Sequence, residues 1–189
     1  MSDDPGSSSL EIALSLHDEG WLDAVDGLEE RAITAVRTAL KLAAPALLEA
    51  GSLEISLVFA DDAEQRSLNR DWRDKDRATN VLSFPNMDEP DDPGPTGPVG
   101  APRLLGDVIL ARETVLREAG EQGKSAADHT THLLVHGLLH LLGHDHEVPD
   151  EAEEMEALER EILAALGIAD PYAEAGTERA EAAREVEHG

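Results

Sequence analysis

The chain has 189 residues, of which 41% are hydrophobic and only 3% aromatic, so it can form one domain whose core is built from aliphatic side chains. It contains no cysteine, which excludes disulfides, thiolate metal sites and cysteine nucleophiles. Its 15 basic and 41 acidic residues give a net charge of −26, which excludes a uniformly basic nucleic-acid-binding surface but not a local basic patch.

The first residues are acidic and polar, without the basic and apolar regions of a secretory signal. The longest uncharged apolar stretch, residues 130–143, is shorter than the ~20 residues that a membrane span needs. We therefore expect a cytoplasmic protein with no membrane association and no disulfide partner.

Composition also predicts the limits of the domain. We expect a disordered N-terminus at residues 1–8, a single catalytic domain at 9–170, and an acidic flexible tail at 171–189. Within the domain, residues 86–103 are rich in proline and glycine, which predicts a mobile loop.

The first third of the chain predicts strand, helix and strand. Residues 10–16 and 53–59 alternate between apolar and polar side chains, the period of a half-buried strand. From about Trp21 to Leu47, apolar residues recur at helical spacing, and Pro45 ends or restarts this helix. A strand–helix–strand order favours two parallel strands joined by a right-handed crossover.

The rest of the chain predicts two further strands and four helices. Asp61 or Asp62 can cap the first of these helices, Ser125 and Asp128 form a capping-box signature, and Pro149 stands where a helix begins. The strands are expected at 80–84 and 104–110, and the helices at 61–72, 111–120, 125–143 and 149–166. Parallel pairing with grouped helices predicts an α+β fold: a four-stranded mixed sheet, about five helices, and a central helix that carries histidines.

Six of the eight histidines lie between residues 129 and 146. His136 and His140 are four residues apart, so on a helix they share one face. Gly143 can adopt a left-handed conformation and end the helix, after which His146 can reach the same ion. Three imidazoles without a thiolate favour zinc, with a fourth position left for water. We expect one zinc ion per chain at this zincin-like site.

Other residues near this motif give weaker signals. His129, His132 and His144 are expected to be surface histidines or to support a ligand from behind. Asp107 lies among aliphatic residues, and we expect it to accept a hydrogen bond from a ligand imidazole or from the backbone. Gly137 stands where a helical zinc peptidase of the H-E-x-x-H type has its general-base glutamate, which disfavours a peptidase.

Four of the basic residues, Arg70, Arg73, Lys75 and Arg77, fall within eight positions. Arginine forks and a lysine charge suit phosphate oxygens, so the segment can act as an anion clamp. The alternative is a solvated turn whose charges pair with the three intervening aspartates.

Several motifs together resemble the YbeY family of bacterial endoribonucleases and ribosomal RNA maturation factors, over roughly residues 53–172. They are LNRDWR at 68–73, TNVLSFP at 79–85, LGDV at 105–108, the histidine segment 136–146 and the acidic stretch DEAEEME at 150–156. The resemblance implies an α+β fold in which zinc is held by His136, His140 and His146. It also implies cleavage of single-stranded RNA, with Arg73 as the functional arginine near the metal. If the chain is such a nuclease, we expect Arg70, Lys75 and Arg77 to hold flanking phosphates.

The resemblance further implies a role in maturing the 3′ end of small-subunit ribosomal RNA and in ribosome quality control. The expected partners are ribosomal RNA, the small ribosomal subunit and ribosome-associated assembly factors. At position 144 the family usually has tyrosine, which leaves open whether His144 contacts the metal. Two other hypotheses remain: a metalloprotease-like hydrolase, and a non-enzymatic ribosome-assembly factor with structural zinc.

Overall fold

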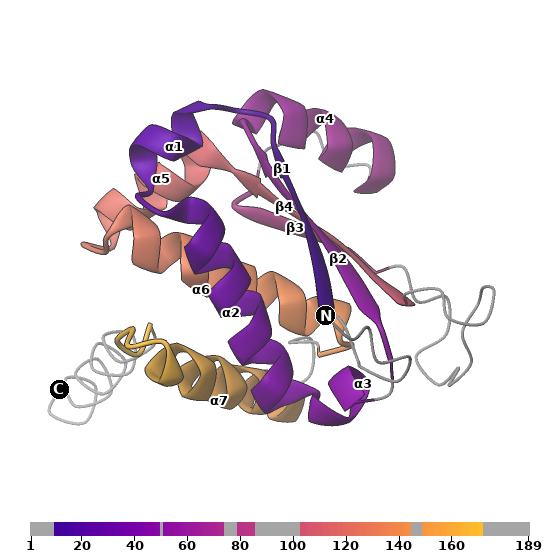
Figure 1. Ribbon diagram of the computed structural model, residues 1–189. Helices are drawn as coiled ribbons and strands as arrows, with labels where there is room; N and C mark the ends of the chain where they lie inside the picture. Colours follow the sequence, from indigo (N-terminus) through magenta and orange to yellow (C-terminus); the bar gives the residue numbers. More distant parts are fainter. Residues whose placement is uncertain (1–9, 50, 74–78, 86–102, 145–148, 172–189) are drawn as a thin grey trace, which may run out of the picture.

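The computed structural model describes residues 10–49, 51–73, 79–85, 103–144 and 149–171 (Figure 1). Its sheet has the order β1-β2-β4-β3, with β1 (Leu10–Leu16), β2 (Leu53–Ala60) and β4 (Arg103–Ala111) parallel. The edge strand β3 (Val81–Pro85) runs antiparallel to β4. The predicted mixed sheet and the parallel pairing of its first two strands are therefore confirmed.

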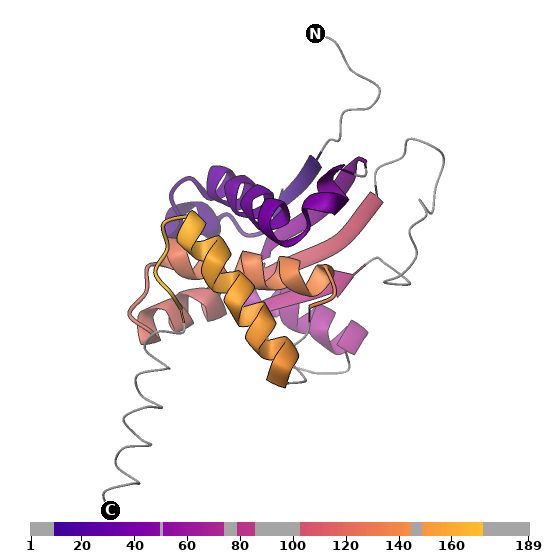
Figure 2. The same cartoon turned by 90° about the horizontal axis from the view of Figure 1, so that it is seen from below.

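Seven helices surround this sheet in the described residues. They are α1 (Gly20–Ala24), α2 (Leu28–Ala43), α3 (Pro45–Glu49), α4 (Asp62–Arg73), α5 (Arg112–Glu121), α6 (Ala126–Leu141) and α7 (Pro149–Ala165). Helix α4 covers one face of the sheet, while α2, α6 and α7 lie on the other (Figures 1 and 2). Helix α6 packs against α2, α5, α7, β3 and β4, which confirms that the histidine-bearing helix is central.

The described residues contain two more helices than the roughly five that we predicted, because the segment 21–47 is divided into α1, α2 and α3. Gly27 adopts a left-handed φ of 65°, a conformation that ends a helical path and that glycine accepts without strain. The backbone therefore turns between α1 and α2, although the apolar spacing continues across the break. Pro45 restarts the chain as α3, as its position allowed.

The sheet carries apolar side chains on both faces. The larger cluster lies between the sheet and helices α1, α2, α6 and α7, and includes Trp21, Phe59 and Leu138. A smaller cluster of Ala60, Leu82 and Ile109 lies on the face covered by α4. In the described part of the chain, no helix combines the length and apolarity that crossing a membrane requires. The predicted tails lie almost entirely outside the described residues. The same holds for the predicted loop, of which only Arg103 is described, as the first residue of β4.

The ends of α6 have the capping chemistry that the sequence predicts. The Ser125 hydroxyl accepts a hydrogen bond from the Asp128 backbone N–H at 3.0 Å. At the other end Gly143 has a φ of 94°, and the backbone N–H of His144 donates to the carbonyl of Leu139 at 3.0 Å. Helix α6 therefore ends at Leu141, one residue after His140, and Gly143 provides the left-handed stop that the sequence predicts.

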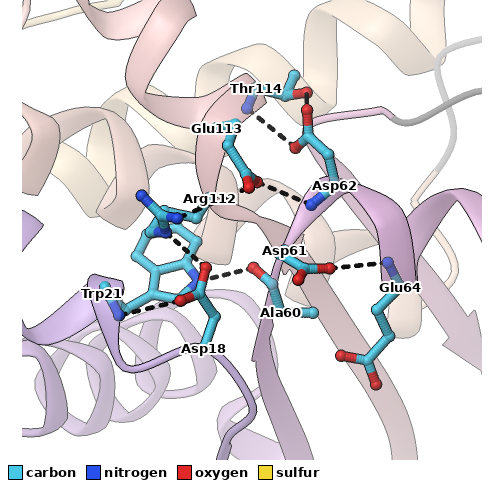
Figure 3. Close-up of polar contacts among 10 residues, drawn as sticks. Asp18, Trp21, Ala60, Asp61, Asp62, Glu64, Arg112, Glu113 and Thr114 are labelled. Atoms are coloured by element: carbon cyan, nitrogen blue, oxygen red, sulfur yellow. Dashed lines mark hydrogen bonds and ion pairs between the residues drawn. The ribbon is translucent and has the colours of Figure 1, made fainter.

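A network of polar contacts joins the carboxyl ends of β1, β2 and β4 (Figure 3). Arg112 donates to Asp18 at 2.5 Å, and this bond holds the pKa of the Asp18 carboxyl below its ordinary value. Asp62 accepts from both the backbone N–H and the hydroxyl of Thr114, at 3.0 and 2.9 Å. These side chains bind one another across the junction. Their polar groups are therefore explained by a structural role, which is to hold β2, α4 and α5 together.

Candidate metal centre

His136 and His140 lie one turn apart on α6, and their Nε2 atoms are 3.0 Å from each other. Two imidazole nitrogens bound to one tetrahedral zinc at ~2.0–2.1 Å lie about 3.3 Å apart. The two rings therefore already point their Nε2 atoms at nearly the spacing that a shared ion needs. Both side chains are only partly buried, so an ion can reach them from solvent.

Glu159 approaches this pair from α7. Its Oε1 atom lies 2.5 Å from Nδ1 of His136, and its Oε2 atom lies 3.1 Å from Nε2 of His132. The glutamate is fully buried, at 0% exposure, in the layer between α6 and α7. A carboxylate behind a ligand imidazole is the usual support of a zinc-bound histidine, so the donor set fits zinc.

A second histidine–carboxylate pair lies nearer the start of the same helix, where the histidine is buried and the carboxylate is partly exposed. His129 is 3% exposed, and its Nε2 atom lies 2.9 Å from Glu118, which also accepts from the Asn80 amide at 3.0 Å. Burial lowers the pKa of His129, because the charged imidazole loses its hydration, and the hydrogen bond to Glu118 opposes this effect. His129 is therefore a buried histidine tied to α5 rather than a surface one.

Gly137 explains how α6 approaches the sheet so closely. A Cβ atom at this position would lie 2.8 Å from Cγ1 of Val108 and 3.1 Å from Oγ of Ser83. The Ser83 hydroxyl also donates to the Gly137 carbonyl at 3.0 Å. The position that carries the glutamate of an H-E-x-x-H peptidase thus faces β3 and β4 here, where a longer side chain has no space.

The described residues contain only part of the predicted ligand set. Among them, no group of three histidine, cysteine or carboxylate side chains is arranged to hold a metal ion by itself. His146, the predicted third ligand, lies outside the described residues. His144 is half-buried just after the end of α6, and its prediction as a supporting residue stays a prediction.

The basic segment is described only in part. The exposed Arg70 side chain lies 3.5 Å from Asp71, and the backbone of Arg73 forms the end of α4. Lys75 and Arg77 lie outside the described residues. Helix α4, which carries Arg70 and the backbone of Arg73, covers the face of the sheet opposite to α6 (Figure 1).

Asp107 is not placed beside the histidines. It stands opposite Phe84 in β3, and Phe84 packs into the small cluster on the α4 face. Its neighbour Val108 faces α6 instead, and successive residues of a strand point to opposite faces. The expectation that Asp107 supports a ligand imidazole is therefore not supported by its position in the sheet.

Comparison with known proteins covers most of the chain. The family described as endoribonuclease YbeY matches residues 23–167. The chain belongs to this family. A relative named Endoribonuclease YbeY from Paramagnetospirillum magneticum is 53% identical over 170 residues, covering 88% of this chain and 98% of its own. Its namesake from Azorhizobium caulinodans is 52% identical over 164 residues, covering 87% and 97%.

The YbeY family also includes a relative of the same name from Agrobacterium fabrum, which is 48% identical and covers 88% of this chain and 96% of its own. Among solved structures, a solution structure from Thermotoga maritima covers 86% of this chain and 97% of its own, with a TM-score of 0.49 and 22% identity. The match to the family and the three curated relatives confirm the family resemblance that the sequence motifs indicated.

Sequence reasoning missed Glu159, although a signal for it is present. The buried side of α7 consists of Met155, Glu159, Ile162 and Leu163, so a carboxylate occupies a position of the apolar stripe. A charged residue on the core-facing side of a helix needs a partner. A helix with several histidines elsewhere in the same chain is the natural place to look for that partner.

Proposed function

We propose that this chain is a zinc-dependent endoribonuclease with one ion per chain, held by His136, His140 and His146. The observation that carries the proposal is the convergence of the Nε2 atoms of His136 and His140, 3.0 Å apart, in a member of a nuclease family. The buried carboxylate behind His136 supports the same assignment.

The relatives are named endoribonucleases, which supports RNA as the substrate. We further propose that the RNA is single-stranded and that the cellular substrate is the 3′ end of small-subunit ribosomal RNA, in ribosome maturation and quality control. The partners would then be ribosomal RNA, the small subunit and assembly factors bound to it, in the cytoplasm. This finer assignment rests on the motifs shared with the family.

In this proposal the protein's own groups orient and neutralise the phosphodiester. When bound, zinc supplies Lewis-acid charge and lowers the pKa of a water ligand to ~7. The Arg73 guanidinium would stabilise the charge that develops on the phosphate oxygens, and Arg70, Lys75 and Arg77 would hold flanking phosphates. Gly137 contributes no proton acceptor, and its tight contacts with β3 and β4 leave no room for one.

The test combines metal analysis of the purified full chain with an RNA cleavage assay. We expect about one zinc per chain, cleavage of single-stranded RNA that a chelator abolishes and zinc restores, and no cleavage of a denatured protein offered in parallel. His136→Ala should lose both zinc and cleavage. His17→Ala is a matched control, because His17 is a half-exposed histidine that bonds Glu64 at 2.7 Å.

Each alternative gives a different result in the same experiment. Chelator-sensitive cleavage of the denatured protein would identify a metalloprotease-like hydrolase. Full zinc occupancy without any turnover would identify an assembly factor with structural zinc. Zinc retained by His136→Ala would show that the ligands are assigned wrongly.

A further inference from the structure

We propose that Glu159 is a positioning residue of the metal centre: it fixes His136 in the tautomer that carries its proton on Nδ1, and so turns the Nε2 lone pair toward His140. This inference rests on the proposed function for its consequence, although the hydrogen bond itself can be tested without metal. Through Glu159, the acidic helix α7 would contribute directly to the geometry of the metal site.

The hydrogen-bonding capacities of Glu159 and His136 decide which ring nitrogen carries the proton. An ionised carboxylate has only acceptors, and a neutral imidazole has one N–H and one lone pair. Oε1 of Glu159 lies 2.5 Å from Nδ1 of His136, so with Glu159 ionised the N–H of that ring is on Nδ1. The lone pair then remains on Nε2, the atom that faces His140 at 3.0 Å and the atom that a metal would use.

The other carboxylate oxygen of Glu159 is also held by an imidazole. Oε2 lies 3.1 Å from Nε2 of His132, which must therefore donate as well. The side chain of His132 is only 13% exposed, so this bond is largely protected from water. A carboxylate held at both oxygens cannot rotate away from His136, and His132 acquires a role as the residue that orients Glu159.

The same contacts decide what Glu159 does not do. Its side chain is 1% exposed, and both oxygens already accept hydrogen bonds from rings. A general base must reach the proton that it removes, directly or through one water. Glu159 therefore acts through His136 and does not replace the glutamate that position 137 lacks.

The structure also accounts for the cost of burying this charge. An isolated buried carboxylate is strongly unfavourable, and hydrogen bonds to both oxygens offset the lost hydration. Glu159 sits between Met155 and Ile162 on the buried side of α7, where an apolar residue would pack without this cost. A site requirement explains why a carboxylate occupies the position.

The decisive measurement is the tautomer of His136 in the metal-free protein, read from long-range proton–nitrogen correlations of its ring. We expect the proton on Nδ1 in the wild-type chain. In Glu159→Gln the amide offers one acceptor and one donor group, so it can accept an N–H from only one of the two rings. The other ring must then present its lone pair to the amide, which requires the opposite tautomer. We expect His136 or His132 to change tautomer and zinc affinity to fall by about 10–100-fold, measured by competition with a chelator.

Glu156→Gln is the matched control, because Glu156 lies on the same helix, is 43% exposed and contacts Arg160 only at 4.0 Å. It should change neither the tautomer nor the zinc affinity. A wild-type His136 with its proton on Nε2, or a Glu159→Gln variant with unchanged zinc affinity, would overturn the proposal. If Glu159→Gln does not fold, the wild-type tautomer alone decides. A wild-type chain that binds no zinc would contradict the proposed function, whereas the tautomer would still test the bond to Glu159.

Discussion

Adding one methyl group at Gly137 tests how closely α6 must sit on the sheet. A Cβ atom there would lie 2.8 Å from Cγ1 of Val108, 3.1 Å from Oγ of Ser83 and 3.3 Å from Cγ2 of Val81. Non-bonded carbon atoms normally lie ~3.5–4.0 Å apart, so the first contact is far too short. Valine is stiff at χ1, and all three neighbours belong to strands. The helix therefore has to move away from the sheet.

The expected change in the free energy of unfolding combines one stabilising effect with two destabilising ones. In an open helix, replacing glycine by alanine stabilises by about 1 kcal/mol. Overpacking a close contact costs about 1–3 kcal/mol, and moving the helix also stretches the bond from the Ser83 hydroxyl to the Gly137 carbonyl, worth about 1 kcal/mol. We expect Gly137→Ala to lower the free energy of unfolding by about 1–3 kcal/mol.

Urea denaturation followed by circular dichroism measures this loss. Gly120→Ala is the control, because Gly120 is exposed on α5 and a Cβ there meets no atom within 4 Å. It should be neutral or stabilising by up to about 1 kcal/mol. In a Val108→Ala background, which removes the nearest atom, Gly137→Ala should cost less than it does alone. Wild-type stability for Gly137→Ala, together with additivity in the double variant, would refute the reasoning.

Three further outcomes are expected. Gly137→Glu restores the H-E-x-x-H spacing but points a longer side chain at the same strand atoms, so it should unfold the chain more readily than Gly137→Ala and show no peptidase activity. Arg73→Ala should keep zinc and lose RNA cleavage by about 10²–10³-fold, with partial recovery in Arg73→Lys; unchanged cleavage would remove Arg73 from the mechanism. Burial lowers the pKa of His129, so as the pH falls this histidine binds a proton in the unfolded chain before it does so in the folded one. The stability of the folded chain should therefore decrease as the pH falls below the ordinary histidine pKa of about 6.5. Urea titrations at several pH values should show a flatter dependence in His129→Gln, and an identical slope would contradict this assignment.

Local chemistry made much of the fold predictable. Ser125, Pro149 and Gly143 act within a few residues of themselves, as cap, first helical residue and left-handed stop, and the structure confirms all three. The break at Gly27 was missed for the opposite reason. The apolar spacing that marks the core side of a helix continues across it, because α1 and α2 both pack into the same cluster.

The site shows the same limit. The shared face of His136 and His140 follows from their spacing alone, whereas Glu159 comes from another helix and its partners depend on how α6 and α7 pack. Asp107 illustrates a different difficulty. Strand β4 is apolar toward both faces, with Val108 toward α6 and Ile109 in the cluster beside α4. Alternation in such a strand cannot indicate which face a lone carboxylate occupies.

The net charge of −26 is the strongest objection to an RNA substrate, and the acids are concentrated toward the two ends of the sequence. Residues 1–30 contain nine acids and no lysine or arginine, and residues 147–189 contain 14 acids and three arginines. Charges separated by more than about 8 Å are largely screened at physiological ionic strength, so repulsion depends on the carboxylates nearest the bound phosphate. Glu159 is the carboxylate that contacts His136, and its two oxygens face the imidazole nitrogens of His136 and His132 in a buried layer. Both oxygens are therefore engaged by these two rings and are shielded from a phosphate bound at the solvent side, which makes the residue compatible with both a metal cation and an anionic substrate.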